Sequence, residues 1–268
     1  MPPLVAALLG IVEGLTEYLP VSSTGHLILA GKALGAEGAG LESFDVVIQL
    51  GAVLAVVVEY RRLLGERVRG LFGGKPEAWR LLVALILGFL PAAGFGFLFR
   101  KSIKAHLFGP VPVAAALIVG GVLMIVIERI RAHRKITGLE GLEHVTPLRA
   151  FLIGLGQCIS LWPGSSRSMC TIVAGQLTGL STATAAEFSF LLALPTLGAA
   201  TLYEGFKARQ ELASGIGTTS LLIGLVVSFL VAWAVIAGFI RYLQRRGLEP
   251  FGYYRIALGA VVFWVLSG

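Results

Sequence analysis

Long apolar runs alternate with short charged segments along this chain, and that alternation restricts the fold more than any other feature. We read six runs as full membrane spans; they approach or exceed the roughly 20 helical residues that span about 30 Å of hydrocarbon, except for the shorter last run. They cover residues 44–60, 79–99, 111–127, 187–203, 218–240 and 253–266. The sequence therefore predicts an all-α polytopic membrane protein with six full spans.

The composition agrees with a membrane protein. Hydrophobic residues make up 56% of the 268 residues and charged residues 14%, whereas a soluble domain averages about 45–50% and about 25%. The net charge of +7 does not predict a nucleic-acid partner, because the basic residues cluster between apolar runs as cytoplasmic loops require. Cys158 and Cys170 lie in apolar surroundings, so we expect no disulfide framework. No basic region precedes the first apolar run, so we expect no cleaved signal peptide.

Two further apolar stretches are interrupted by polar residues and are too short on either side to span a bilayer. Residues 4–31 are broken by Glu13, Glu17 and the polar segment 20–26. Residues 149–180 are broken by the segment 163–168. Irregular backbone at membrane depth is tolerated only inside protein or beside water. We expect each stretch to form a re-entrant helical hairpin with a polar tip.

The two interrupted stretches resemble each other. Residues 20–24 (PVSST) match residues 163–167 (PGSSR) at an offset of 143, and with a one-residue gap Gly10 and Glu13 match Gly154 and Gln157. This pattern is typical of internal duplication with broken helices in corresponding positions. We expect one integral membrane domain made of two repeats, residues 1–130 and 148–268. Three spans separate the hairpins, so the repeats should have inverted topology.

Basic residues predict the orientation of the chain. One set of loops and helix ends holds Arg61, Arg62, Arg67, Arg69, Lys75, Arg80, Arg129, Arg131, Arg134, Lys135, Arg149, Arg241, Arg245, Arg246 and Arg255. The opposite set holds only Lys32, Arg100, Lys101, Lys104, Lys207 and Arg209. By the positive-inside rule the larger set is cytoplasmic. The first hairpin should then enter from outside, with both termini external.

The residues of the two tips are suited to binding phosphate. The first tip carries Ser22, Ser23, Thr24 and His26, and the second carries Ser165, Ser166, Arg167, Ser168 and Thr171. Each tip leads into a short helix whose first N–H groups favour an anion. A guanidinium, several hydroxyls and two helix N-termini together predict a phosphate or diphosphate site, if the tips meet near mid-membrane.

Glu13 and Glu17 lie four residues apart, so a helix places them on one face. They would repel an anion, and a divalent cation such as Mg²⁺ or Ca²⁺ would resolve the conflict, because Mg²⁺ is commonly held by one or two carboxylates plus phosphate oxygens. His26 follows Ser23 by one helical turn and could transfer a proton.

Each of these residues also has a structural interpretation. The glutamates could pair with a buried cation, the serines could cap helices, and Arg167 or His26 could be structural. Gln49, Gln157 and Glu187 read as supporting polar groups, and the aromatic residues as packing.

Residues 13–26, EGLTEYLPVSSTGH, and residues 163–171, PGSSRSMCT, resemble the two signature motifs of the bacterial undecaprenyl-diphosphate phosphatase family, also known as bacitracin-resistance proteins. The resemblance covers nearly the whole chain. It implies an inner-membrane enzyme that removes the terminal phosphate of a polyprenyl diphosphate lipid, recycling the carrier for peptidoglycan synthesis. It also implies a divalent cation, an active site facing the periplasm, and functional roles for Glu13, Glu17, Ser23, Thr24, His26, Ser166 and Arg167. A homodimer is a candidate assembly.

The expected chemistry is phosphoryl transfer with Ser23 as nucleophile, His26 as general base and Arg167 stabilising the transferred group. Two variants remain open: His26 as the nucleophile, or attack by a metal-bound water. The rival class is a transporter or flippase of polyprenyl phosphates, because inverted repeats with broken helices are also the plan of secondary transporters. A purely structural scaffold would leave the buried charges unexplained.

Overall fold

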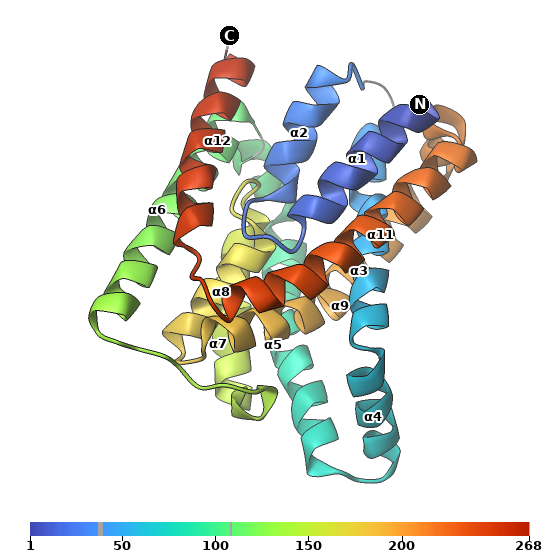
Figure 1. Ribbon diagram of the computed structural model, residues 1–268. Coiled ribbons are helices and arrows are strands. Elements are labelled where there is room, and N and C mark those ends of the chain that lie inside the picture. Colours follow the sequence, from blue (N-terminus) through green and yellow to red (C-terminus); the bar gives the residue numbers. More distant parts are fainter. Residues whose placement is uncertain (37–39, 108, 268) are drawn as a thin grey trace.

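The computed structural model describes residues 1–36, 40–107 and 109–267, and of residues 100, 104, 106, 110, 266 and 267 it describes the backbone alone. Over these residues the protein is helical, with one isolated β-bridge between Leu139 and Leu180. The α-helices are α1 (Pro3–Thr16), α2 (Ser23–Ala33), α3 (Leu41–Glu59), α4 (Arg61–Phe72), α5 (Pro76–Leu107), α6 (Pro110–His133), α7 (Pro147–Gln157), α8 (Arg167–Leu177), α9 (Thr182–Lys207), α10 (Arg209–Glu211), α11 (Thr218–Leu243) and α12 (Glu249–Ser267) (Figure 1). Three short segments of other helical types are η1 (Leu142–His144), η2 (Cys158–Leu161) and η3 (Leu212–Ile216).

Five of the described helices are long and apolar enough to cross a membrane. They are α3, the Pro76–Phe99 part of α5, the Val111–His133 part of α6, α9 and α11. The prediction of an all-α membrane protein is confirmed. The sixth run expected to span, residues 253–266, falls within α12.

Each interrupted stretch folds as two short helices joined by a tip. α1 and α2 form the first pair, and α7 and α8 the second. α1 and α7 both begin at a proline, Pro3 and Pro147, and α2 and α8 are both 11 residues long. α2 begins at Ser23 and α8 at Arg167, so the helices correspond at an offset of 144. The offset of 143 that aligns Pro20 with Pro163 pairs Ser23 with Ser166. The helix starts instead pair Ser22 with Ser166, so the two alignments differ by one residue.

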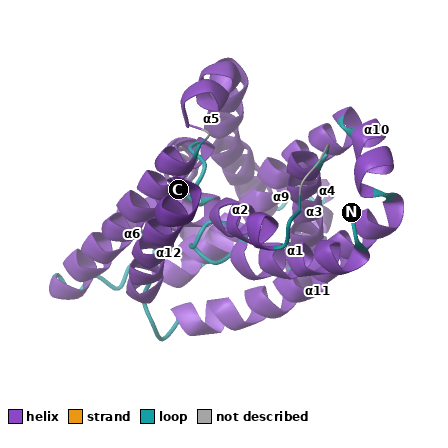
Figure 2. Ribbon diagram, turned by 90° about the horizontal axis from the view of Figure 1, so that it is seen from above, coloured by secondary structure: helices purple, strands orange, loops and turns teal. Residues whose placement is uncertain are grey.

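The two halves of the chain make corresponding helix contacts: the first helix of each half packs on a long helix of the other half. α1 packs on α11 and α7 packs on α5, while α3 contacts α9 and α6 lies along α12 (Figures 1 and 2). A methyl group at Gly10 of α1 would lie 2.7 Å from the Gly224 oxygen of α11, and one at Gly154 of α7 would lie 2.5 Å from the Gly88 oxygen of α5. Glycine therefore permits both close contacts, as it does between membrane helices generally.

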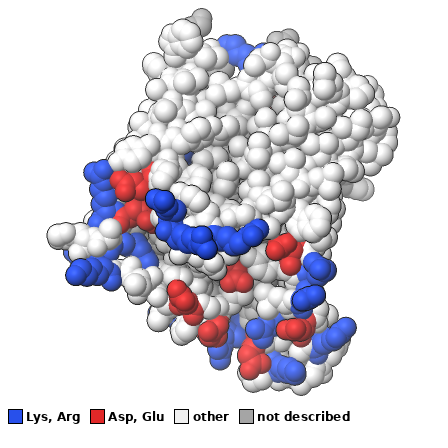
Figure 3. Space-filling model, in the orientation of Figure 1, with Lys and Arg blue, Asp and Glu red and all other residues white. Residues whose placement is uncertain are grey.

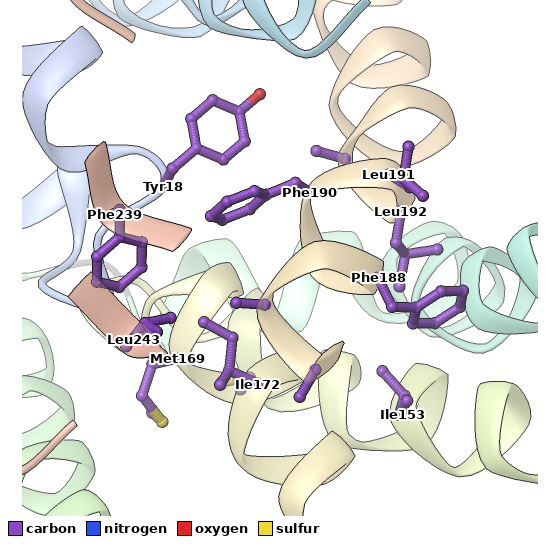
Figure 4. Packing of buried hydrophobic residues seen from close by; sticks show 14 of the residues in the cluster. Tyr18, Ile153, Met169, Ile172, Phe188, Phe190, Leu191, Leu192, Phe239 and Leu243 are labelled. Atoms are coloured by element: carbon purple, nitrogen blue, oxygen red, sulfur yellow. The ribbon is translucent and has the colours of Figure 1, made fainter. Parts of the chain in front are cut away.

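The buried core joins both hairpins to α9 and α11. Tyr18 follows α1 and packs edge-on against Phe190 of α9, with ring centroids 4.9 Å apart. Phe239 of α11 also lies beside Phe190, with ring centroids 6.2 Å apart, and Met169 and Ile172 of α8 belong to the same cluster (Figure 4). The tips are thus anchored in the largest apolar cluster of the described structure.

Charged side chains gather over one end of the molecule. Lys, Arg, Asp and Glu cover the lower part of the visible face, around α4 and the C-terminal end of α11, and the upper part is largely free of them (Figure 3). The segment after Tyr60, read from sequence as a charged connection, is the helix α4. Two arginines assigned to the cytoplasmic set are instead buried, Arg131 at 9% exposure and Arg255 at 0%. The side chains of Arg100 and Lys104, in the opposite set, lie outside the described residues.

Candidate active site

The two hairpin tips meet at the carboxylate of Glu17. The Ser23 hydroxyl donates a hydrogen bond to Glu17 Oε2 at 2.8 Å, and Arg167 Nη2 donates to Glu17 Oε1 at 3.1 Å. All three side chains are buried. Ser23 is the first residue of α2 and Arg167 the first residue of α8. One carboxylate therefore links the N-terminal ends of two short helices from opposite halves of the chain.

Both helix ends are formed by a serine in an unusual backbone conformation. Ser22 has φ 72° and Ser166 has φ 71°, where residues other than glycine are uncommon. Their hydroxyls accept hydrogen bonds from the backbone N–H groups of Gly25 and Met169. Such strain costs of order 1–3 kcal/mol and clusters at functional sites. The expected cap at Ser22 is confirmed, whereas the second helix is capped by Ser166 and not by Ser165. Capping leaves the positive end of each helix dipole directed at the tip.

Arg167 is held in place by three further groups. Its Nη1 donates to the Ser189 carbonyl at 2.8 Å and to the Ser189 hydroxyl at 3.2 Å. Its guanidinium lies 5.6 Å from the ring centroid of Tyr18, a cation–π contact. Tyr18 is fixed in turn by a 2.8 Å hydrogen bond to the Ala52 carbonyl. Sequence reasoning read Tyr18 as packing and gave Ser189 no role, because each is an ordinary residue within an apolar segment.

The other hydroxyls expected at the site lie around this centre. Thr171 is buried. Its hydroxyl donates to the Arg167 carbonyl at 2.9 Å and lies 2.6 Å from the Ser189 hydroxyl, and both contacts stabilise the first turn of α8. Ser168 is fully buried beside Ser166, with their hydroxyls 3.4 Å apart. Thr24 is half-buried in the first turn of α2. Ser165 bonds the Trp162 carbonyl, which gives it a turn-forming role.

Glu13 is fully buried, and neither of its carboxylate oxygens has a hydrogen-bond partner in the part of the chain that is described. The Glu17 N–H donates to the Glu13 carbonyl at 2.9 Å, so the helical turn that aligns the two side chains continues through Glu17. At the corresponding position of the second hairpin, the amide of Gln157 is also buried, but it contacts Gly88 and Thr196. An isolated buried carboxylate is costly, so Glu13 fits a cation ligand.

A complete protein cage for a metal is not present among the described residues, where no group of three or more His, Cys, Asp or Glu side chains occurs. Two carboxylates are nevertheless a donor set suited to Mg²⁺, which usually keeps waters and takes further oxygens from a substrate phosphate. Glu13 and Glu17 therefore fit the expected cation.

His26 lies apart from the Ser23–Glu17–Arg167 group. Its Nδ1 contacts the Ser22 carbonyl at 2.8 Å, and its Nε2 contacts the Tyr254 hydroxyl of α12 at 2.6 Å. The His26 and Tyr254 rings are stacked 5.6 Å apart. The hydrogen bond from Ser23 goes to Glu17 and not to His26. Tyr254 was not singled out from sequence, because nothing near it in the chain resembles the hairpin motifs.

The protein matches known proteins over most of its length. The family model for the bacitracin resistance protein BacA matches residues 6–261. The chain is 61% identical over 261 residues to the undecaprenyl-diphosphatase of Sorangium cellulosum (strain So ce56), covering 97% of this chain and 85% of that protein. It is 49% identical over 258 residues to undecaprenyl-diphosphatase 2 of Rhodospirillum rubrum, covering 96% of this chain and 92% of that protein. It is 45% identical over 267 residues to the undecaprenyl-diphosphatase of Thermoanaerobacter pseudethanolicus, covering 98% and 96%. With its motifs in place at both hairpin tips, the chain belongs to the bacitracin resistance protein BacA family.

Proposed function

We propose that this protein hydrolyses undecaprenyl diphosphate to undecaprenyl phosphate and inorganic phosphate, and so recycles the lipid carrier of peptidoglycan synthesis. The relatives of known sequence carry the name of this activity, and their family is named for bacitracin resistance. The observation that carries the proposal is the meeting of Ser23, Glu17 and Arg167 at two helix N-termini. This is a nucleophile, a proton acceptor and a cation placed where an anion is favoured.

Ser23 is the proposed nucleophile. Its oxygen attacks the terminal phosphorus, the bond from that phosphorus to the bridging oxygen breaks, and the lipid monophosphate leaves. Water then hydrolyses the phosphoserine and releases inorganic phosphate. The 2.8 Å hydrogen bond from Ser23 supports Glu17, in place of the expected His26, as the acceptor for the hydroxyl proton. When the phosphoryl group of the substrate binds Arg167, it replaces Glu17 as the partner of the guanidinium. Glu17 is then free to accept the proton of Ser23.

Arg167 stabilises the negative charge of the transferring phosphoryl group. Ser189 and Tyr18 keep the guanidinium in position before the substrate arrives, so little reorganisation is required. The free N–H groups at the start of α2 and α8 add to the same effect. His26, held by Tyr254, remains a proposed proton donor or acceptor at the edge of the site.

A divalent cation held by Glu13 and Glu17 would supply charge neutralisation of the diphosphate oxygens. Of the two glutamates, Glu13 supports a cation site more strongly, because its carboxylate oxygens have no hydrogen-bond partner in the described residues. Mg²⁺ and Ca²⁺ both prefer such oxygen ligands.

In the bilayer, we place α1–α2 and α7–α8 as re-entrant hairpins and add α12 to the five spanning helices, in two inverted repeats of residues 1–130 and 148–268. The common offset of 144 and the exchanged packing of α1 on α11 and α7 on α5 support this arrangement. The charged end of Figure 3 is the cytoplasmic end. The active site then faces the periplasm of a bacterial inner membrane, as do both termini.

Phosphate release by purified protein in detergent tests the activity, because transport without compartments releases none. We expect the Ser23→Ala and Arg167→Ala variants to lose on the order of 10²-fold or more in kcat. Ser160→Ala and Arg149→Ala provide matched controls, since these side chains donate to the backbone carbonyls of Gln157, Thr178 and His144 and not to Ser23, Glu17 or Arg167. If Arg167→Ala and His26→Ala released phosphate at the wild-type rate, the site assignment would be wrong.

Trapping with substrate labelled in the terminal phosphate distinguishes the chemical routes. Label on Ser23 supports the proposed nucleophile. Label on His26 would replace it with the histidine. Absence of label, under conditions that accumulate an intermediate, would favour direct attack by water.

A further inference from the structure

Arg255 of α12 joins both hairpin tips, although it belongs to neither hairpin. Its Nη1 donates to the Pro20 carbonyl of the first tip at 3.2 Å, and its Nη2 donates to the Gly164 carbonyl of the second tip at 2.9 Å. Nη2 also donates to the Ala116 carbonyl of α6 at 3.1 Å. The side chain is fully buried. One guanidinium therefore fixes the two tips to each other and to the α6–α12 pair.

This arginine has no carboxylate partner among the described residues, since all of its hydrogen bonds go to backbone carbonyls. Burying an unpaired cation is costly, and a structure that only needed tight packing would place an apolar side chain here. The planar fork of a guanidinium, by contrast, reaches three acceptors in fixed directions. The arrangement is suited to setting a distance between three separate backbone segments.

The space for this side chain is provided by a glycine on the facing helix. A methyl group at Gly120 of α6 would clash with Arg255 Nη2 and lie 2.9 Å from the Met169 side chain. The next residue of α6, Gly121, faces Gly252 of α12, and these two glycines let α6 and α12 approach closely. α6 and α12 therefore form a fixed base that presents Arg255 to the tips.

We propose that Arg255 is a positioning residue of the active site: it holds the Pro20 and Gly164 carbonyls so that Ser23, Glu17 and Arg167 meet in reacting geometry. Pro20 lies between Glu17 and Ser23 in the chain, and Gly164 precedes Arg167 by three residues. The adjacent Tyr254 contacts His26 from the same helix, so α12 locates the first tip through two consecutive side chains. The proposal rests on the proposed phosphatase function.

Arg131 provides a matched control. It is also a buried arginine with no carboxylate partner in the described chain, and it also donates to three carbonyls, those of Gln176, Thr137 and Leu180. Its contacts lie at the far end of α8 from the tip. Loss of Arg131 should therefore lower stability without disturbing the Ser23–Glu17–Arg167 geometry.

The test compares Arg255→Met with Arg131→Met as full-length proteins in detergent, measuring melting temperature, kcat and KM on the lipid diphosphate. We expect both variants to melt at lower temperature. Arg255→Met should lose at least tenfold in kcat per folded molecule with KM changed less than threefold, whereas Arg131→Met keeps kcat within twofold. Guanidinium ion added to Arg255→Ala should restore part of its kcat, and should leave Arg131→Ala unchanged.

A second variant leaves Arg255 in the chain. Gly120→Ala displaces the guanidinium, and we expect it to lower kcat in the same direction, while Gly94→Ala, which has open space around it, does not. If Arg255→Met folds and keeps the kcat of Arg131→Met, or if Gly120→Ala is as active as Gly94→Ala, the proposal is overturned. An inactive wild-type protein would instead refute the phosphatase function and would be recognised before any variant is measured.

Discussion

Glu13 and Glu17 lie one helical turn apart, but their surroundings give them different tasks. Glu17 receives hydrogen bonds from Ser23 and Arg167. Glu13 is equally buried and receives none from the described residues. The cost of a buried carboxylate is relieved by a partner or by a proton. At the residue scale, Glu17 therefore joins the two tips, and Glu13 is the carboxyl group that the described residues leave without a partner.

Replacing Glu13 by glutamine should separate metal binding from folding. In the presence of a chelator we expect Glu13→Gln to unfold at no lower a temperature than the wild type, because a neutral amide replaces a buried carboxyl group that has no partner in the described residues. Added Mg²⁺ should raise the melting temperature of the wild type and have little effect on Glu13→Gln.

The control for this measurement is Glu66→Gln, an exposed carboxylate on α4. It should respond to Mg²⁺ as the wild type does. A Glu13→Gln variant that Mg²⁺ still stabilises fully would exclude Glu13 as a ligand, whatever its activity.

How far single residues could be predicted depends on where their partners lie in the sequence. The two tips that carry Glu17, Ser23 and Arg167 were expected to form one site, because polar residues in two apolar hairpins stand out, but Ser23 was paired with His26 and not with Glu17. Ser189, Tyr254 and Arg255 were not predicted, since each comes from another helix and its role exists only through a contact more than 20 residues away. Arg255 was counted among the charges of loops and helix ends because it lies at the start of the apolar run 253–266.

At the scale of helices, close contact between backbones determines the packing. Gly51 of α3 faces α11, where a methyl group would collide with the Leu225 carbonyl and lie 2.9 Å from the Phe229 nitrogen. Gly94 of α5 has nothing within 4 Å. Both glycines lie in membrane-spanning helices, but Gly51 is packed against another backbone and Gly94 has open space around it.

Gly51→Ala should destabilise the protein by about 1–3 kcal/mol or more, because the backbones must separate. Gly94→Ala should be neutral or stabilise by up to about 1 kcal/mol, since alanine is the better helix former. Thermal melting in detergent compares the two, and equal melting temperatures would show that the α3–α11 contact is looser than described.

The expected spans coincide with helices. The ends of these helices, the helix α4 and the register of the repeat were predicted less accurately. α5 continues to Leu107, beyond the apolar run, because nothing in its last turns forbids a helix. α4 was missed because four arginines and a glutamate among its 12 residues leave no continuous apolar run. The one-residue error in the repeat arose from matching Pro20 with Pro163, whereas the structure aligns the helix caps Ser22 and Ser166.

At the scale of the whole molecule, charged residues are concentrated at one end of the helical bundle. The end that carries α4 is covered by charged residues, and the end that carries both termini is largely free of them (Figures 1 and 3). The ion pair of Arg129 with Glu249, 3.0 Å long, also lies at the start of α12. The hydrogen bonds of Glu249 with Tyr253 and Arg129 lower the pKa of Glu249, so it stays charged there at neutral pH.

Single cysteines can test this orientation in intact cells. In a chain whose Cys158 and Cys170 are replaced by alanine, we expect Ala33→Cys and Gln210→Cys to react with an impermeant maleimide from outside, because both positions are exposed at the proposed periplasmic end. Glu77→Cys and Glu140→Cys, exposed at the other end, should react only after the cells are opened. The reverse pattern would place the site on the cytoplasmic side, where the charged end would face away from the cytoplasm against the positive-inside rule. Labelling of all four positions from outside would mean that one of the proposed crossings is absent.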